Sequence, residues 1–179
     1  MADLPRGLLP LGASLALAWI LISLFAGIGP QAWVALSGRV EDAGLFFALF
    51  GLAAAAGAAL GGRLMDRHGR ISTLVGAHVV SAVGYGIAAG AVLLRSLPAF
   101  VAGTALFSFA IGTVGLTRVV AADLAAPEVR GRAVARVQIA PLAGALLGPG
   151  LLIVGSLVGR APSPTGRVWL LGPLLALAA

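Results

Sequence analysis

Cysteine and lysine are both absent from the sequence. The absence of cysteine excludes disulfides, zinc–thiolate sites and cysteine nucleophiles. Histidine occurs only at His68 and His78, which is too few for a histidine-based metal cluster. No serine–histidine pair, carboxylate pair or metal-ligating set is placed for catalysis. The sequence therefore predicts neither an enzyme nor a bound metal or cofactor.

Charged residues are scarce as well. They make up 10% of the chain, against 60% hydrophobic residues, and the mean hydropathy is +1.06. A soluble domain carries about a quarter charged residues to cover its surface. The basic residues are all arginines in short gaps between apolar runs, which is typical of membrane topology signals rather than of a nucleic-acid groove. We expect a polytopic integral membrane protein embedded in the lipid bilayer, with no nucleic-acid partner.

Five apolar runs are long enough to cross a bilayer, which takes about 20 residues. The dipeptide Gly29-Pro30 is expected to end the first helix, and Asp42 to cap the second. Pro141 and Pro149 would bend the fifth helix. The sequence thus predicts one all-α membrane domain over residues 1–179. Its helices are expected at about 8–29, 43–62, 71–94, 96–117 and 137–159, with a truncated sixth at 168–179.

The arginines predict the orientation of the chain. Cytoplasmic loops carry an excess of basic residues, and Trp and Tyr gather at membrane interfaces. With the N-terminus inside, Trp33 and Trp169 both fall near the outer interface. We therefore expect a cytoplasmic N-terminus in a bacterial-type inner or plasma membrane. In that orientation eight arginines lie inside (Arg6, Arg63, Arg67, Arg70, Arg118, Arg130, Arg132, Arg136) and four outside (Arg39, Arg95, Arg160, Arg167).

Three pairs of glycines are spaced four residues apart within the predicted helices. Such spacing places both small residues on one helix face, where it lets backbones approach closely in lipid. We interpret the pairs as helix-packing surfaces rather than as the lining of a substrate path. The pairs are Gly57/Gly61, Gly86/Gly90 and Gly144/Gly148.

The loop between the second and third predicted helices carries a specific pattern. From Gly61 to Leu74 it resembles the signature loop G-x-L-a-D-r-x-G-r-[kr]-x-x-l of the major facilitator superfamily. Ile71 stands where the family usually has a second basic residue. Charge alone favours a simpler interpretation, in which the loop is a positive-inside anchor that Asp66 neutralises. The matching residues are Gly62, Leu64, Asp66, Arg67, Gly69, Arg70 and Leu74.

Two further segments are similar to the same family. Residues 122–133 resemble its "aD…p…Rg.a" segment, with Asp123 and Arg130 at the charged positions. Gly144, Gly148 and Pro149 partly match the G-x-x-x-G-P-x-x-G-G motif of drug/proton antiporters. The last two glycines of that motif are replaced at positions 152–153, so an efflux type is one alternative among transporters.

The resemblance implies a fold and a mechanism. Family members have two six-helix bundles that rock about a central site, so this chain looks like an N-terminal half whose C-terminal half is missing. It would carry an unknown small molecule as a secondary transporter. The implied switch residues are Gly62, Asp66, Arg67, Gly69, Arg70, Asp123 and Arg130.

The implied roles of these residues differ. Asp66 would meet the N-terminal end of a helix in the other bundle, whose dipole favours a carboxylate. Arg70 and Asp123 would hold Asp66 in a charge triad, and Arg130 would tether the loop between the fourth and fifth helices. We expect His78 to bond helices together rather than to bind substrate.

The implied substrate cavity lies beside the first and fourth helices. The residues it nominates are Trp19, Ser23, Thr104 and Ser108, for which ordinary buried packing is the competing interpretation. Ser108 also stands where many members carry an arginine within the membrane.

Two other functions stay open at this point. An ABC-importer permease has a coupling loop E-A-A-x-x-x-G followed by isoleucine and proline. The segment from Leu124 through Gly131 to Pro141 is similar to it, but without the glutamate. A non-transporting truncated membrane fragment is the other alternative.

Overall fold

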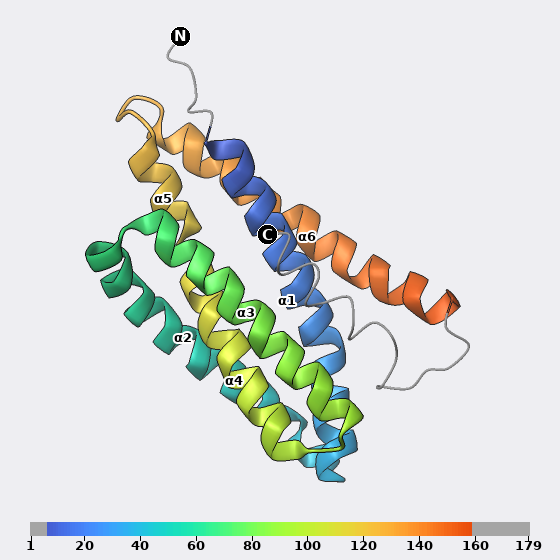
Figure 1. Ribbon diagram of the computed structural model, residues 1–179. Coiled ribbons are helices and arrows are strands. Elements are labelled where there is room, and N and C mark those ends of the chain that lie inside the picture. The colour runs from blue at the N-terminus through green and yellow to red at the C-terminus, as the bar shows by residue number, and fades with distance from the viewer. Residues whose placement is uncertain (1–6, 159–179) are drawn as a thin grey trace.

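The computed structural model describes residues 7–158, with side chains as far as residue 150. The regular structure of this part is entirely helical, as Figure 1 shows, which confirms the predicted all-α class. The sixth predicted helix, at 168–179, lies outside the described residues. The elements are α1 (Leu8–Ser37), a short 3-10 helix η1 (Val40–Asp42), α2 (Ala43–His68), α3 (Arg70–Leu93), α4 (Leu97–Val114), α5 (Thr117–Leu124) and α6 (Arg130–Val158).

Four of the described helical segments are long and apolar enough to span a membrane. Two of them join a long helix to a short neighbour, η1 with α2 and α4 with α5. The predicted fifth span lies in α6, part of which is beyond the described side chains. The bundle is therefore that of an integral membrane protein. The four segments are Leu8–Ser37, Val40–His68, Arg70–Leu93 and Leu97–Leu124.

The first helix is longer than the sequence predicted. It continues through Pro30 to Ser37 and ends at Gly38, whose φ is +73° and whose N–H donates to Val34 O at 2.8 Å. Proline removes one backbone donor, but breaking the helix in lipid would leave several backbone groups unpaired. The left-handed glycine after the last turn is the effective stop signal. The predicted end at Gly29-Pro30 is wrong.

The start of α2 also differs from the prediction. Asp42 occupies the N-cap position, but its side chain makes no capping hydrogen bond. Its carboxylate lies 3.7 Å from Arg39 Nε, and the Glu41 carboxylate lies 3.3 Å from the same nitrogen. Two acidic residues therefore neutralise the arginine of the α1–α2 connection. The free N–H groups of α2 are not capped by Asp42.

Other helix ends extend into the charged segments between spans. α2 continues to His68 rather than stopping near residue 62, and α6 starts at Arg130 rather than near residue 137. Arginine is a good helix former, and a helix can continue past the hydrocarbon layer into the polar region. After Gly115 the chain forms the additional helix α5, which the sequence did not predict.

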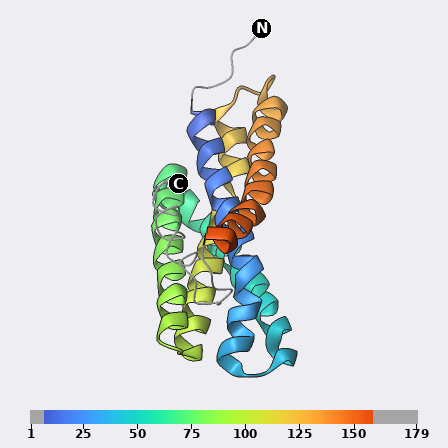
Figure 2. The ribbon, with the colours of Figure 1, turned by 90° about the vertical axis from the view of Figure 1, so that its right-hand side faces the viewer.

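The helices pack in two groups around α4 and α1. Figures 1 and 2 show α2 and α3 lying along α4, while α6 crosses α1. An aromatic cluster joins four helices, because the Phe25 ring lies 4.5 Å from that of Phe107, 5.4 Å from Tyr85 and 5.5 Å from Phe46. Trp33 is buried edge-on against Phe100. It packs inside the bundle, so it gives no support to the predicted interfacial position; Trp169 lies outside the described residues.

Glycines lie at close contacts between helices. A Cβ at Gly57 would lie 1.8 Å from Phe109 O of α4, and one at Gly61 would lie 2.6 Å from Thr113 Oγ1. A Cβ at Gly144 would lie 2.5 Å from Trp19 Cβ, and one at Gly148 2.4 Å from Ser23 Cβ. The packing interpretation is therefore confirmed for these two pairs, one on each side of the bundle.

The third glycine pair behaves differently. A Cβ at Gly90 would meet nothing within 4 Å. The close α3–α4 contact is made instead by Gly84 against Phe107 and by Gly103 against Ala88. The prediction for Gly86/Gly90 is wrong at Gly90, because the spacing alone does not show which face of a helix meets a neighbour.

Candidate functional site

A single residue, Gly69, connects α2 to α3. Its φ of +89° and ψ of 153° belong to a region of backbone space that is essentially restricted to glycine. Its N–H donates to Met65 O at 3.1 Å, and its carbonyl accepts the Thr73 hydroxyl at 2.8 Å. The sharp reversal predicted at Gly69 is confirmed. The two helix ends are consequently held close together, which fixes the spacing of the charged residues on either side.

An ion pair links this turn to α5. Arg70, the first residue of α3, pairs with the Asp123 carboxylate near the end of α5. Arg130, the first residue of α6, donates from Nε to Ala122 O at 3.0 Å. Three predicted switch residues therefore join the starts of α3 and α6 to the end of α5. Both partners of the ion pair are partly exposed, so it contributes about 0–1 kcal/mol and mainly sets position.

Asp66 does not join this link. Its side chain is exposed, and within residues 7–150 it makes no ion pair. On α2, the neighbouring Met65 faces the bundle, and each step along a helix turns by about 100°. Asp66 therefore points away from the packed face. Of the triad implied by the resemblance, this structure contains the Arg70–Asp123 ion pair but no ion pair between Arg70 and Asp66.

Two grooves open beside the turn, one between α2, α3 and α4 and the other between α2 and α4. One, here called the histidine groove, has a volume of about 330 Å³. The other, the arginine groove, has about 370 Å³ and is lined by Leu60, Arg63, Leu64, Arg67 and Phe109. Leu64 and Phe109 line both. The histidine groove is lined by Leu64, His68, Ser72, Thr73, Gly76, Ala77, Val80, Phe109, Ala110 and Thr113.

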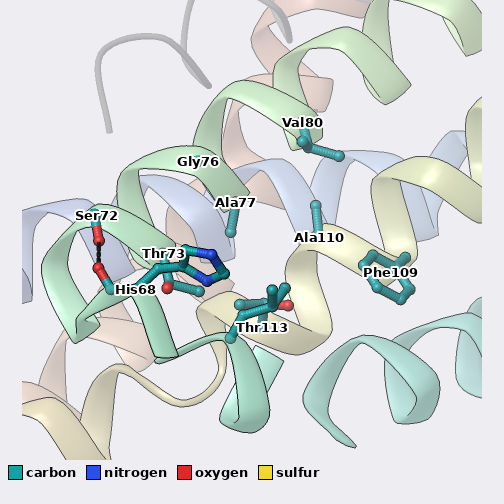
Figure 3. Close-up of a pocket in the computed structure, with 10 residues that line it drawn as sticks. His68, Ser72, Thr73, Gly76, Ala77, Val80, Phe109, Ala110 and Thr113 are labelled. Atoms are coloured by element: carbon teal, nitrogen blue, oxygen red, sulfur yellow. Dashed lines mark hydrogen bonds between the residues drawn. The ribbon is translucent and has the colours of Figure 1, made fainter. Parts of the chain in front are cut away.

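The sequence reasoning missed these grooves. Figure 3 shows His68, Thr73 and Thr113 toward one end of the histidine groove and Val80 and Phe109 toward the other. The available signal was the spacing on α2, where residues at i, i+3, i+4, i+7 and i+8 share one helix face. Leu60, Arg63, Leu64, Arg67 and His68 have this spacing. That face mixes apolar and basic side chains.

Comparison with known proteins decides the family. A family model described as the Major Facilitator Superfamily matches residues 11–179. The chain belongs to the major facilitator superfamily. A search of the curated proteins finds no significant match. Superfamily members are membrane transporters rather than enzymes, which agrees with the apolar helices of the bundle.

Four residues were predicted from the resemblance to line a substrate cavity. They fall into two separate pairs. Trp19 and Ser23, on α1, lie against Gly144 and Gly148 of α6. Thr104 and Ser108 are fully buried on α4, where the Ser108 hydroxyl donates to Thr104 O at 2.6 Å. This bond within the helix is typical of ordinary serine packing. None of the four lines the histidine groove or the arginine groove.

One buried hydroxyl on α4 stands apart from this packing. The Thr104 Oγ1 has no hydrogen-bond partner in the described part of the chain. Buried polar groups are usually paired. The described residues leave this hydroxyl without a partner, as they do Ser81 Oγ and His78 Nδ1 on α3.

His78 bonds two helices in this superfamily bundle. The residue is buried, and its Nε2 lies 2.8 Å from the Ser14 hydroxyl of α1. This contact agrees with the helix-bonding role expected from the sequence. A hydrogen bond between spans is worth about 0.6 kcal/mol on average. His78 therefore ties α3 to α1 within the apolar part of both helices.

Proposed function

We propose that the chain is one bundle of a secondary transporter that carries a small solute by alternating access. The observation that supports this best is the Arg70–Asp123 pair, together with the Arg130–Ala122 hydrogen bond. These contacts make the α2–α3 turn, α5 and the start of α6 one connected unit at one end of the bundle. Superfamily membership supports transport as the class of function. It also favours this proposal over an ABC-importer permease.

Alternating access needs a second bundle to supply the other wall of the cavity. In this proposal, Asp66 is the contact point between the bundles at the gate. Its exposed carboxylate would meet the positive end of a helix dipole across the gate. Gly69 and the Arg70–Asp123 pair hold the segment that presents it. Gly62 and Arg67 belong to the same proposed gate segment.

The gate is proposed to face the cytoplasm. The support is the excess of arginines, eight against four, on the side that holds the α2–α3 turn and α5. With this orientation the N-terminus is cytoplasmic, in a bacterial-type inner or plasma membrane. The gate then closes the transport path on its inner side.

The substrate is proposed to bind beside α1 and α4. The support is the buried Thr104 hydroxyl, whose Oγ1 lacks a partner in the described region. Ser108, Trp19 and Ser23 complete the proposed lining. An efflux direction is the alternative suggested by the partial antiporter motif. The Gly144 and Gly148 of that motif pack on α1, a role that fits import equally well.

The gate proposal is tested by Asp66→Asn in proteoliposomes that hold this chain with its proposed second bundle. After a screen of labelled sugars, amino acids and cationic drugs identifies a substrate, uptake and binding are measured separately. We expect slower uptake with retained binding, because losing one charge-assisted contact shifts the conformational balance by about 1–3 kcal/mol. Asp42→Asn, at the other end of α2, is the matched control. Unchanged uptake in a combined Asp66→Asn and Arg70→Ala variant would exclude this gate.

A further inference from the structure

The histidine groove and the arginine groove together have an apolar floor and a basic edge. The floor consists mainly of Gly76, Ala77, Val80 and Ala110, with Phe109 shared between the grooves. His68, Arg63 and Arg67 lie on the same face of α2 along the edge. Asp66 lines neither groove. The side chains along this surface therefore change from apolar on the floor to basic at the edge.

Some polar side chains at this edge already donate hydrogen bonds within the protein, and others do not. The Ser72 and Thr73 hydroxyls already donate to the backbone carbonyls of the turn. The side chains of Arg63, Arg67 and His68 make no hydrogen bond or ion pair anywhere in residues 7–150. The free donors are thus two guanidinium groups and one imidazole. Such donors suit an anion, and guanidinium in particular suits phosphate oxygens.

The length of the groove fits one lipid leaflet. From Ser72 to Val80 the lining of α3 covers eight residue steps, or about 12 Å of helix. Half of the hydrocarbon core of a bilayer is about 15 Å thick. Exposed apolar side chains border the surface, among them Leu60 on α2 and Val79 on α3. The groove therefore runs through hydrocarbon and has its cationic edge near the polar region.

We propose that this surface binds one anionic phospholipid, with an acyl chain in the histidine groove and the phosphate against Arg63, Arg67 and His68. The argument for this occupant is charge complementarity at the edge together with an apolar floor of matching depth. The bound lipid covers the face of α2 that carries Arg63, Arg67 and His68, next to the gate. This inference shares Arg67 with the proposed gate segment, but it does not rest on the transport proposal, because it concerns lipid binding and needs no substrate.

The binding is tested by photolabelling the full chain in phosphatidylcholine nanodiscs. The probe is phosphatidylglycerol with a photoreactive group on its acyl chain, and labelled peptides are mapped by mass spectrometry. We expect labelling within residues 60–80 and 109–113, displaced by unlabelled phosphatidylglycerol. Equal displacement by phosphatidylcholine would show that binding does not depend on the negative charge of the lipid. Displacement by inorganic phosphate would show that the site binds a free anion. Either result overturns the proposal.

Two sets of variants separate the edge from the floor. Arg63→Gln with Arg67→Gln should lower labelling about tenfold, because each arginine near an anionic lipid adds to its binding. Arg63→Lys with Arg67→Lys should retain most of it. Arg39→Gln with Arg95→Gln removes the same charge elsewhere and should leave labelling unchanged. Labelling that persists in the double glutamine variant contradicts the proposal.

The floor is tested by filling it. Gly76 lines the histidine groove, and a Cβ there would meet nothing within 4 Å, so we expect the side chain of Gly76→Leu to extend into the groove. Gly90→Leu on the same helix is the matched control, since a Cβ at Gly90 also meets nothing and Gly90 lines neither groove. We expect labelling to be lost in Gly76→Leu alone. Equal labelling of the two variants would place the lipid elsewhere, even if the arginine variants failed to fold.

Discussion

At the scale of single residues, backbone conformation and side-chain placement decide what the gate segment can do. Gly69 alone permits the reversal between α2 and α3, because its φ and ψ lie where other residues are strained. Asp66 is left exposed by its position one step beyond the buried Met65. The ion pair between Arg70 and Asp123 forms without it. The backbone of the turn is thus fixed by Gly69, while the Asp66 carboxylate makes no ion pair with the described residues.

Replacing Gly69 tests the strained turn. Gly69→Ala should lower the free energy of unfolding by about 1–3 kcal/mol, the usual cost of a residue held in a disfavoured backbone region. The measurement is thermal unfolding of the purified chain in detergent. Gly62→Ala is the control, because Gly62 lies inside α2 and a Cβ there meets nothing within 4 Å. If both variants unfold at the wild-type temperature, the turn is not held in this conformation.

At the scale of helices, close glycine contacts hold the bundle together. α2 meets α4 through Gly57 and Gly61, and α6 meets α1 through Gly144 and Gly148. These glycines allow backbone-to-backbone approach, which matters in lipid because apolar burial does not drive helices together there. The Thr113 hydroxyl adds a bond to Gly57 O at 2.9 Å. The two sides of the bundle therefore use the same kind of interface.

A methyl group at the α2–α4 contact should separate these helices. Gly57→Ala places a Cβ 1.8 Å from Phe109 O, so the backbones must move apart and the Thr113 bond is lost. We expect a loss of about 1–3 kcal/mol, as for other overpacked sites. Thermal melts of the purified variant give the measurement. Gly51→Ala on the same helix has open space around its Cβ and should match the wild type; equal melting of both variants would speak against this contact.

At the scale of the whole molecule, the order of elements along the chain determines which ends share a membrane side. The α2–α3 turn, α5 and the start of α6 lie together, as the Arg70–Asp123 and Arg130–Ala122 contacts show. The α1–α2 connection with its Arg39 cluster lies at the other end of the spans. The described chain is thus polar at two ends and apolar between them.

Cysteine labelling can assign those two ends to membrane sides. The sequence has no cysteine, so Val40→Cys and Ala126→Cys each introduce a single thiol at an exposed position. With a cytoplasmic N-terminus, a membrane-impermeant maleimide should label only Val40→Cys in intact cells. Permeabilised cells, in which both should react, control for expression and reactivity. Labelling of Ala126→Cys alone in intact cells would reverse the orientation.

The local features of this protein were the most predictable from sequence. The apolar runs gave the spans, and the Gly69 turn followed from a glycine between charged residues at the end of an apolar helix. The end of α1 was missed because lipid favours continuing a helix through Pro30. On the third helix a packing surface was predicted at Gly86/Gly90, but α3 meets α4 at Gly84 instead, since residue spacing does not reveal which face meets a neighbouring helix. The grooves were missed for the same reason, because α2, α3 and α4 define them only after packing.

The pairing of α1 with α6 has a consequence for how the protein is made. Gly144, which packs against Trp19, follows it by 125 residues. At synthesis rates of about 5–20 residues per second, roughly 6–25 s pass before that partner leaves the ribosome. During this interval the α1 surface around Trp19 and Ser23 has no α6 to cover it. The nascent first helix therefore remains in lipid, or against the insertion machinery, until α6 has been synthesised.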